Sequence, residues 1–361
     1  MGSFPILLVA AVAVVGLASD LPGSTLRCVS KIQNSRVTGH CISIKKCDYF
    51  MSFLSSGNPS QSDRNLLREN HCGTNEDGVQ VCCPSTEGLG ALTHPLLPQK
   101  CGRVRWQRSN GTITNIREFP WLALIEYTRA NQEKLHACGG VLISERYILT
   151  AAHCLTQAPG LDLRITAVRL GEWDTSTNPD CQYHEDTKQA ECAPPYQDIS
   201  VKQLVPHPLY SPKNLSQVFD IALIRLASPA ELNDFVEPIC LPNKQLRADE
   251  LEGLVTELAG WQAKSSPRMQ KSTVTISSIE ECQQKYSVQN LNIQASQLCG
   301  VANAKECHGN AGGPLMLYKN DGYLLGGLVS FGPVPCPTTG WPDVYTRVAS
   351  YIDWIHDNLR A

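Results

Sequence analysis

Residues Thr150–Cys154 read Thr-Ala-Ala-His-Cys and follow the apolar run Val141–Leu149, while Asp220–Leu226 read Asp-Ile-Ala-Leu-Ile-Arg-Leu. The second stretch places an acidic residue at the head of another apolar strand. A histidine that acts as a base needs a buried carboxylate to orient its ring and to stabilise the imidazolium. His153 and Asp220 are therefore candidates for such a pair.

The chain around these two stretches has the pattern of an all-β domain. From Cys101 onward, turn residues separate short β-type runs, as in Trp121–Tyr127, Ile221–Leu226 and Tyr323–Ser330. This spacing predicts antiparallel barrels or sandwiches. Near the C-terminus, Tyr351–Leu359 places its apolar residues on one helical face. We therefore expect a β body with a terminal helix packed on it.

Further motifs connect the two stretches to a known family. They are Glu118-Phe-Pro-Trp121, Cys307-His-Gly-Asn-Ala-Gly-Gly-Pro-Leu315 and Val344-Tyr-Thr-Arg-Val348. Together with His153 and Asp220 they resemble the chymotrypsin/trypsin family, from Cys101 to the C-terminus. The resemblance implies two six-stranded Greek-key β-barrels with the active site in the cleft between them.

The N-terminus has the features of a secretory signal peptide. The apolar run Ile6–Leu17 is shorter than the ~20 residues that span a bilayer, and small residues follow it before Asp20. We predict a signal peptide over residues 1–19, with cleavage near Ala18 or Ser19. A buried strand or a membrane anchor is the alternative, and the usual basic residues before the apolar run are missing.

Sixteen cysteines follow the predicted signal, and an even number in an oxidising compartment predicts eight disulfides. A zinc site is the alternative, but the adjacent Cys82 and Cys83 suit two separate disulfide partners better. Residues 28–83 hold six cysteines and few large apolar side chains, so this small domain needs covalent links. Residues 84–100 have the composition of a linker, and 101–361 form the large domain.

The six-cysteine unit resembles the clip domain, the regulatory module of arthropod clip-domain serine proteases. The resemblance implies the disulfides Cys28–Cys82, Cys41–Cys72 and Cys47–Cys83. In the large domain it implies Cys101–Cys240, Cys138–Cys154, Cys282–Cys299 and Cys307–Cys336. The remaining Cys181 and Cys192 would close a surface loop after Leu170–Asp174, as in prophenoloxidase-activating proteases.

The chain departs from the protease family at the residues that perform the chemistry. Where the family has Gly-Asp-Ser-Gly-Gly, this chain has Gly309-Asn310-Ala311-Gly312-Gly313. Ala311 lacks the hydroxyl that forms an acyl-enzyme. In the family, the Asp of this motif pairs with a new Ile or Val N-terminus and forms the oxyanion hole. Here Asn310 has no charge, and Arg108-Ser109-Asn110-Gly111 replaces Ile-Val-Gly-Gly, so both halves of that pair are expected to be absent.

The specificity pocket is altered as well. The resemblance implies that Lys305, Asp343, Ser330 and Gly332 line it, with Lys305 at the position where trypsin-like members carry an acid. We predict that Lys305 and Asp343 pair and occlude the pocket. The alternative is that both side chains point into solvent.

Three surface features complete the analysis. Asn110 and Asn214 begin N-glycosylation sequons. An upstream trypsin-like protease could cut after Arg103, Arg105 or Arg108. We expect no cofactor. The acidic residues around the Cys181–Cys192 loop favour a solvated surface over a calcium site, the alternative; they are Glu172, Asp174, Asp180, Glu185 and Asp186.

The formal net charge of -3 does not indicate nucleic-acid binding, and no membrane partner is expected. The first hypothesis is a secreted, catalytically inactive clip-domain protease homologue of arthropod haemolymph. It would act as a cofactor or regulator that binds clip-domain proteases or prophenoloxidase-type substrates in melanisation or Toll-type signalling. The alternatives are an active trypsin-like endopeptidase, and a decoy or adhesion/pattern-recognition protein.

Overall fold

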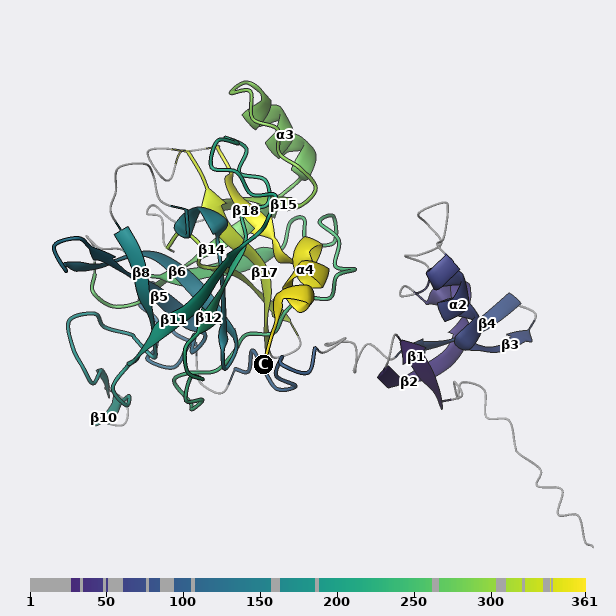
Figure 1. The fold of residues 1–361 in the computed structure, drawn as a ribbon, viewed down its shortest axis with the longest axis horizontal. Coiled ribbons are helices and arrows are strands. Elements are labelled where there is room, and N and C mark those ends of the chain that lie inside the picture. Colours follow the sequence, from purple (N-terminus) through teal and green to yellow (C-terminus); the bar gives the residue numbers. More distant parts are fainter. Residues whose placement is uncertain are drawn as a thin grey trace, which may run out of the picture. The chain divides into compact units, whose positions relative to one another are not determined.

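The computed structural model describes residues 27–32, 35–47, 50, 61–75, 78–84, 94–104, 108–156, 163–185, 188–261, 266–302, 310–319, 322–333, 338 and 340–361. The chain divides between Gly88 and Leu89 into two compact units, drawn in Figure 1. The predicted signal peptide lies outside the described residues. Among those residues, no helix is both long and apolar enough to cross a membrane.

The small unit is a four-stranded antiparallel sheet with one described α-helix. Its strands β1 (Arg27–Ile32), β2 (Ser35–Ser43), β3 (His71–Asn75) and β4 (Gly78–Pro84) lie in the order β1-β2-β4-β3, and α2 spans Gln61–Glu69. A 3₁₀ turn (η1, Ile44–Lys46) follows β2. Among the residues of this unit whose burial the structure describes, the buried apolar ones are Cys47, Phe50, Val81 and Cys82. A unit this small needs disulfides to hold its fold.

The first half of the large unit is a closed barrel, drawn in blue and teal in Figure 1. Its strands are β5 (Leu122–Arg129), β6 (Lys134–Ser144), β7 (Tyr147–Thr150), β8 (Leu163–Leu170), β11 (Gln197–Pro206) and β12 (Ala222–Leu226), in the order β11-β12-β7-β6-β5-β8. The predicted single run Val141–Leu149 is two strands. The polar residues Glu145 and Arg146 form the turn between β6 and β7, which the apolar pattern alone did not separate.

The second half of the large unit is also a closed barrel. Strands β13 (Val255–Gly260), β14 (Gln270–Ser277), β15 (Gln297–Ala302), β16 (Pro314–Lys319), β17 (Gly322–Phe331) and β18 (Asp343–Arg347) lie in the order β13-β14-β15-β18-β17-β16. The predicted all-β fold of two six-stranded barrels is confirmed. A separate two-stranded ribbon consists of β9 (Cys181–His184) and β10 (Gln189–Cys192).

Helices and the segment that holds Leu96 and Leu97 pack against the barrels. Helix α3 spans Ile279–Ser287, and the chain ends in a 3₁₀ turn (η3, Val348–Tyr351) followed by α4 (Ile352–Asn358). Ile352, Ile355 and Leu359 are buried in the main core, which confirms the predicted terminal helix and its apolar face. Leu96 and Leu97, within the proposed linker, also pack against this core.

Candidate functional site

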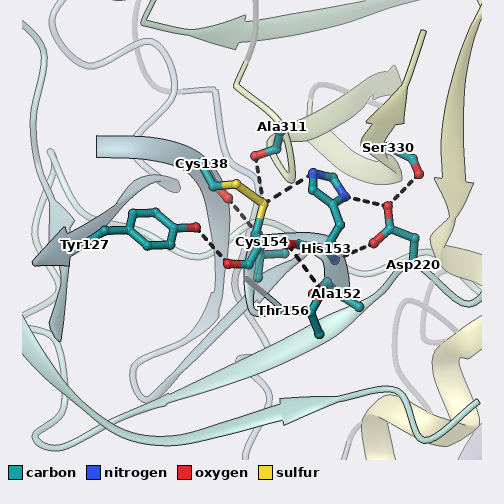
Figure 2. The surroundings of a disulfide bond; sticks show 11 residues. Tyr127, Cys138, Ala152, His153, Cys154, Thr156, Asp220, Ala311 and Ser330 are labelled. Atoms are coloured by element: carbon teal, nitrogen blue, oxygen red, sulfur yellow. Dashed lines mark hydrogen bonds and ion pairs between the residues drawn. A yellow bond between two sulfur atoms is a disulfide. The ribbon is translucent and has the colours of Figure 1, made fainter. Parts of the chain in front are cut away.

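His153 and Asp220 come together because β7 and β12 are neighbours. Thr150 at the end of β7 pairs with Ala222 at the start of β12, so the residues after β7 meet those before β12. His153 lies in a 3₁₀ turn (η2, Ala152–Cys154). Its backbone N–H donates to Asp220 Oδ1, and its ring Nδ1 lies 2.8 Å from Oδ2. Figure 2 shows the pair. Asp220 is fully buried, and the His153 side chain is 28% exposed.

Asp220 also receives hydrogen bonds from the second barrel. The Ser330 hydroxyl of β17 donates to Asp220 Oδ2 at 2.5 Å, and the Thr346 hydroxyl of β18 donates to the Asp220 carbonyl at 2.7 Å. Ser330, which the sequence analysis placed in the pocket lining, is thus buried beside the acid. A buried carboxylate is stable only when hydrogen bonds compensate its lost hydration, and the His153 backbone N–H and the Ser330 hydroxyl supply them here.

Ala311 lies beside the histidine and the Cys138–Cys154 disulfide (Figure 2). Its carbonyl accepts from the Gly139 N–H at 2.8 Å and lies 3.6 Å from Cys154 Sγ, which is itself 3.6 Å from His153 Nε2. The following Gly312 has φ +75°, and a Cβ there would lie 2.2 Å from Thr150 Oγ1. Only glycine fits this approach, which holds Ala311 at a sharp turn.

Asn310 makes a reciprocal pair with one backbone unit. Its Oδ1 accepts from the Trp261 N–H at 2.9 Å, and its Nδ2 donates to the Trp261 carbonyl at 3.1 Å. Both ends of the carboxamide therefore have partners within the protein. Gly309, the other predicted residue of this region, lies outside the described residues.

Arg108 has a partner that the sequence analysis missed. Its guanidinium forms an ion pair with Glu257 of β13, 149 residues further along the chain. A separation this large leaves no signal in local sequence patterns.

The predicted pocket wall contains a desolvated carboxylate. A Cβ added to Gly332 would lie 2.0 Å from Asp343 Oδ1, so the Asp343 side chain lies directly against the Gly332 backbone. Burial raises the pKa of Asp343 to about 6, and burial, followed by the nearby Asp343 carboxylate, raises the pKa of Tyr286 and Tyr345. Lys305 lies outside the described residues, so its pairing with Asp343 stays a prediction.

Comparisons with known proteins cover nearly the whole chain. The family described as Trypsin matches residues 108–355, and the Regulatory CLIP domain of proteinases matches residues 31–83. Serine protease ea of Drosophila melanogaster is 40% identical, with 93% of this chain and 91% of that protein covered. The chain belongs to the clip-domain family of trypsin-like serine proteases.

Two other members of this family bear on function. Phenoloxidase-activating factor 3 of Holotrichia diomphalia is 34% identical, covering 90% of this chain and 92% of that protein. The crystal structure of the Drosophila Grass clip serine protease of the Toll pathway superposes with a TM-score of 0.63 and 27% identity. That match covers 92% of this chain and 97% of the Grass chain.

Seven disulfides join cysteines of this clip-domain protein within the described residues. They are Cys28–Cys82, Cys41–Cys72, Cys47–Cys83, Cys101–Cys240, Cys138–Cys154, Cys181–Cys192 and Cys282–Cys299. These are seven of the eight pairs that the resemblance implied. The eighth, Cys307–Cys336, lies outside the described residues. The sequon residues Asn110 and Asn214 are both exposed, and their glycosylation stays a prediction.

The acidic loop is not the solvated surface that we expected. Glu172, Asp174 and Asp180 are buried, whereas Glu185 is exposed and Asp186 lies outside the described residues. Asp180 Oδ2 accepts from the backbone N–H groups of Trp173 and Asp174. These donors compensate the buried charge, which explains the difference.

The surroundings of Glu172 disfavour its ionised form. Burial, followed by the nearby Asp180 carboxylate, raises the pKa of Glu172 to about 7, although Arg169 opposes the shift. Arg169 Nη1 donates to Glu172 Oε2 at 3.2 Å. The carboxylates of Glu172, Asp174 and Asp180 therefore already have hydrogen-bond partners in the protein.

Proposed function

We propose that this clip-domain protein is a secreted, noncatalytic protease homologue that acts by binding. The observation that carries the proposal is the methyl side chain of Ala311 beside an intact His153–Asp220 pair. Acyl transfer by this family needs a hydroxyl that the histidine can deprotonate. With no hydroxyl at residue 311, the histidine has no nucleophile to activate there.

Two further contacts support the loss of catalysis. The Asn310 carboxamide is neutral and already paired with Trp261, so no counter-charge awaits an incoming α-ammonium group. Burying an ammonium without a counter-charge costs several kcal/mol. In addition, the residue aligned with the family's new N-terminus is Arg108, whose cation is paired with Glu257 elsewhere.

The names of two relatives support a role in an immune protease cascade. One is named a phenoloxidase-activating factor, and another is a clip serine protease of the Toll pathway. We infer that this protein is a cofactor or regulator of an extracellular clip-protease cascade. Its partners would be clip-domain proteases or prophenoloxidase-type substrates in haemolymph.

Serine-directed labelling tests the loss of catalysis. The purified protein is incubated with a serine-reactive phosphonate and a panel of peptide substrates, before and after treatment with a trypsin-like protease that is then inhibited. Trypsin carried through the same steps is the positive control. We expect neither labelling nor turnover in either state. Stoichiometric labelling or turnover would instead identify this protein as an active endopeptidase. Several relatives are named as serine proteases.

The binding role needs a separate measurement. Immobilised protein is exposed to haemolymph, and the captured proteins are identified by mass spectrometry. Enrichment of clip-domain proteases or prophenoloxidase supports the cascade role. Enrichment of matrix proteins, or direct binding to microbial polysaccharide, would favour the decoy or adhesion alternative.

A further inference from the structure

The carboxylate that binds Arg108 is itself well fixed. Glu257 lies on β13, and its side chain is only 8% exposed. One of its oxygens contacts the Arg108 guanidinium, and the other accepts from the Tyr323 hydroxyl at 2.5 Å. A buried carboxylate needs such partners, because its hydration is lost on folding. Arg108 therefore neutralises a charge that the barrel buries.

Two aromatic rings complete the surroundings of this cation. The guanidinium carbon of Arg108 lies 5.0 Å from the Tyr318 ring centroid and 5.9 Å from that of Tyr323. Both distances are within the roughly 6 Å over which a cation and an aromatic face attract each other. A carboxylate with two aromatic faces suits a planar guanidinium better than a compact ammonium group.

The residues after Arg108 are attached to the same surface at successive points. Ser109 N–H donates to Glu118 Oε2 at 3.1 Å, and Lys271 Nζ donates to the Ser109 carbonyl at 2.8 Å while pairing with Glu118. Backbone hydrogen bonds then join Lys271 to Thr112 and Thr114 to Met269. Residues 108–114 therefore follow the start of β14 closely.

We propose that Glu257, Tyr318 and Tyr323 form an intramolecular guanidinium-binding site, with Arg108 as its ligand, that holds residues 108–114 in place. A trypsin-like protease must take the arginine side chain into its own pocket before it cuts the following bond. Because Arg108 is bound in cis, the Arg108–Ser109 bond is protected.

The test compares two glutamates that each pair with an arginine. Glu257→Gln removes the charge of the proposed site at nearly constant volume. Glu133→Gln removes the partner of Arg129 in an exposed ion pair and is the matched control. Each purified full-length protein is digested with dilute trypsin under native conditions, and mass spectrometry follows cleavage after Arg108.

We expect Glu257→Gln to speed cleavage after Arg108 roughly tenfold or more, since losing one partner of a buried pair weakens the fixed state strongly. Glu133→Gln should leave the rate at the wild-type value. An unchanged rate in Glu257→Gln, or an equal increase in the control, would overturn the proposal.

A second variant guards against misfolding of the first. Arg108→Ala removes only a half-exposed side chain, and hydrogen exchange of the Ser109 and Thr114 amides replaces cleavage as the readout. We expect faster exchange at both amides, with partial recovery in Arg108→Lys. Exchange at the wild-type rate in Arg108→Ala would rule the site out. All these readouts report protection of one segment, so they can fail or succeed independently of the proposed function.

Discussion

Two neighbouring side chains, at residues 310 and 311, support the proposed loss of catalysis in different ways. The methyl group of Ala311 provides no nucleophile, whereas the Asn310 carboxamide fixes the adjoining backbone through Trp261. Restoring a serine at residue 311 should therefore not restore the charge that is absent at residue 310.

We predict that Ala311→Ser alone stays inactive. The new hydroxyl would lie near His153, but Asn310 still offers no charge with which to form the oxyanion hole. Loss of one oxyanion donor costs roughly 10²–10³ in kcat, so peptide hydrolysis should remain at least about 100-fold below a trypsin control. Turnover and phosphonate labelling are measured before and after proteolytic treatment. Trypsin-like turnover in this variant would show that the hole forms without the aspartate.

Asp343 gives a pH-dependent prediction. Burial raises its pKa in the folded protein to about 6, above the ordinary value of an unfolded chain, so the ionised form is disfavoured by folding. The resulting destabilisation is nearly absent at pH 4, develops as the pH rises from about 4 to about 6, and is fully present above pH 6. We therefore expect Asp343→Asn to raise the free energy of unfolding at pH 7.5, and to lose this advantage near pH 4.

Urea unfolding at the two pH values measures the effect. The same experiment examines the predicted pair between Lys305 and Asp343. If a cation neutralises Asp343, the asparagine variant will be less stable than the wild-type protein at pH 7.5, and the sign of the difference will reverse.

Among the elements, α3 depends on a single capping residue. The Ser278 side chain accepts from the Glu281 N–H at 3.1 Å, and the first turn carries Glu280 and Glu281. Ser278→Ala should lower the free energy of unfolding by about 1 kcal/mol, measured by urea unfolding. Ser278→Asp, which keeps an acceptor, is the control. Equal losses in both variants would place the effect in packing rather than in the cap.

The loop between β8 and β9 gives a prediction about calcium. Asp180 is occupied by two backbone N–H groups and the Thr177 hydroxyl, and Glu172 by Arg169. Calcium prefers six to eight free oxygen ligands. We expect the melting temperature to be the same in millimolar CaCl₂ and in EGTA. A rise of several degrees with calcium would show that the ion displaces these internal partners.

For the whole molecule, we predict that cutting between the two units leaves the large unit unchanged. The Cys101–Cys240 disulfide, the Arg108–Glu257 pair and the Asn310–Trp261 pair all remain after such a cut. The melting temperature of the large unit should shift by less than about 2 °C, which at this size corresponds to under about 1 kcal/mol. Calorimetry before and after mild trypsin treatment measures it. A larger shift would indicate a zymogen-like rearrangement.

The fold and the central pair could be predicted because their signals are local. His153 lies shortly after an apolar run, and Asp220 lies shortly before β12, so each signal is local in the sequence. Pairing between β7 and β12 then brings the two residues together. The turn at Glu145 and Arg146 was missed because apolar residues lie close to it on both sides. A run of apolar residues cannot by itself show where one strand ends and the next begins.

Other contacts could not be predicted because they join distant residues. Nothing near Arg108 in the sequence indicates Glu257, and nothing near Asn310 indicates the Trp261 backbone. The burial of Glu172 and Asp180 was likewise unexpected, since charged residues are rarely buried without partners. Two donors to Asp180 are the backbone N–H groups of Trp173 and Asp174, and because every sequence contains such groups, no residue pattern identifies them.

The hydrogen bonds of Asp220 have a consequence for how this chain could evolve. Its carboxylate accepts from His153 in one barrel and from Ser330 in the other, so replacing it would damage folding as well as any chemistry. The hydrogen bond of residue 311 to Gly139 is made by its backbone carbonyl, so an exchange of serine and alanine there does not remove it. Under selection for folding alone, a lineage would lose its serine early and keep its aspartate and histidine. Among the descendants of an enzyme, the residue that costs least to lose is then the most informative record of function.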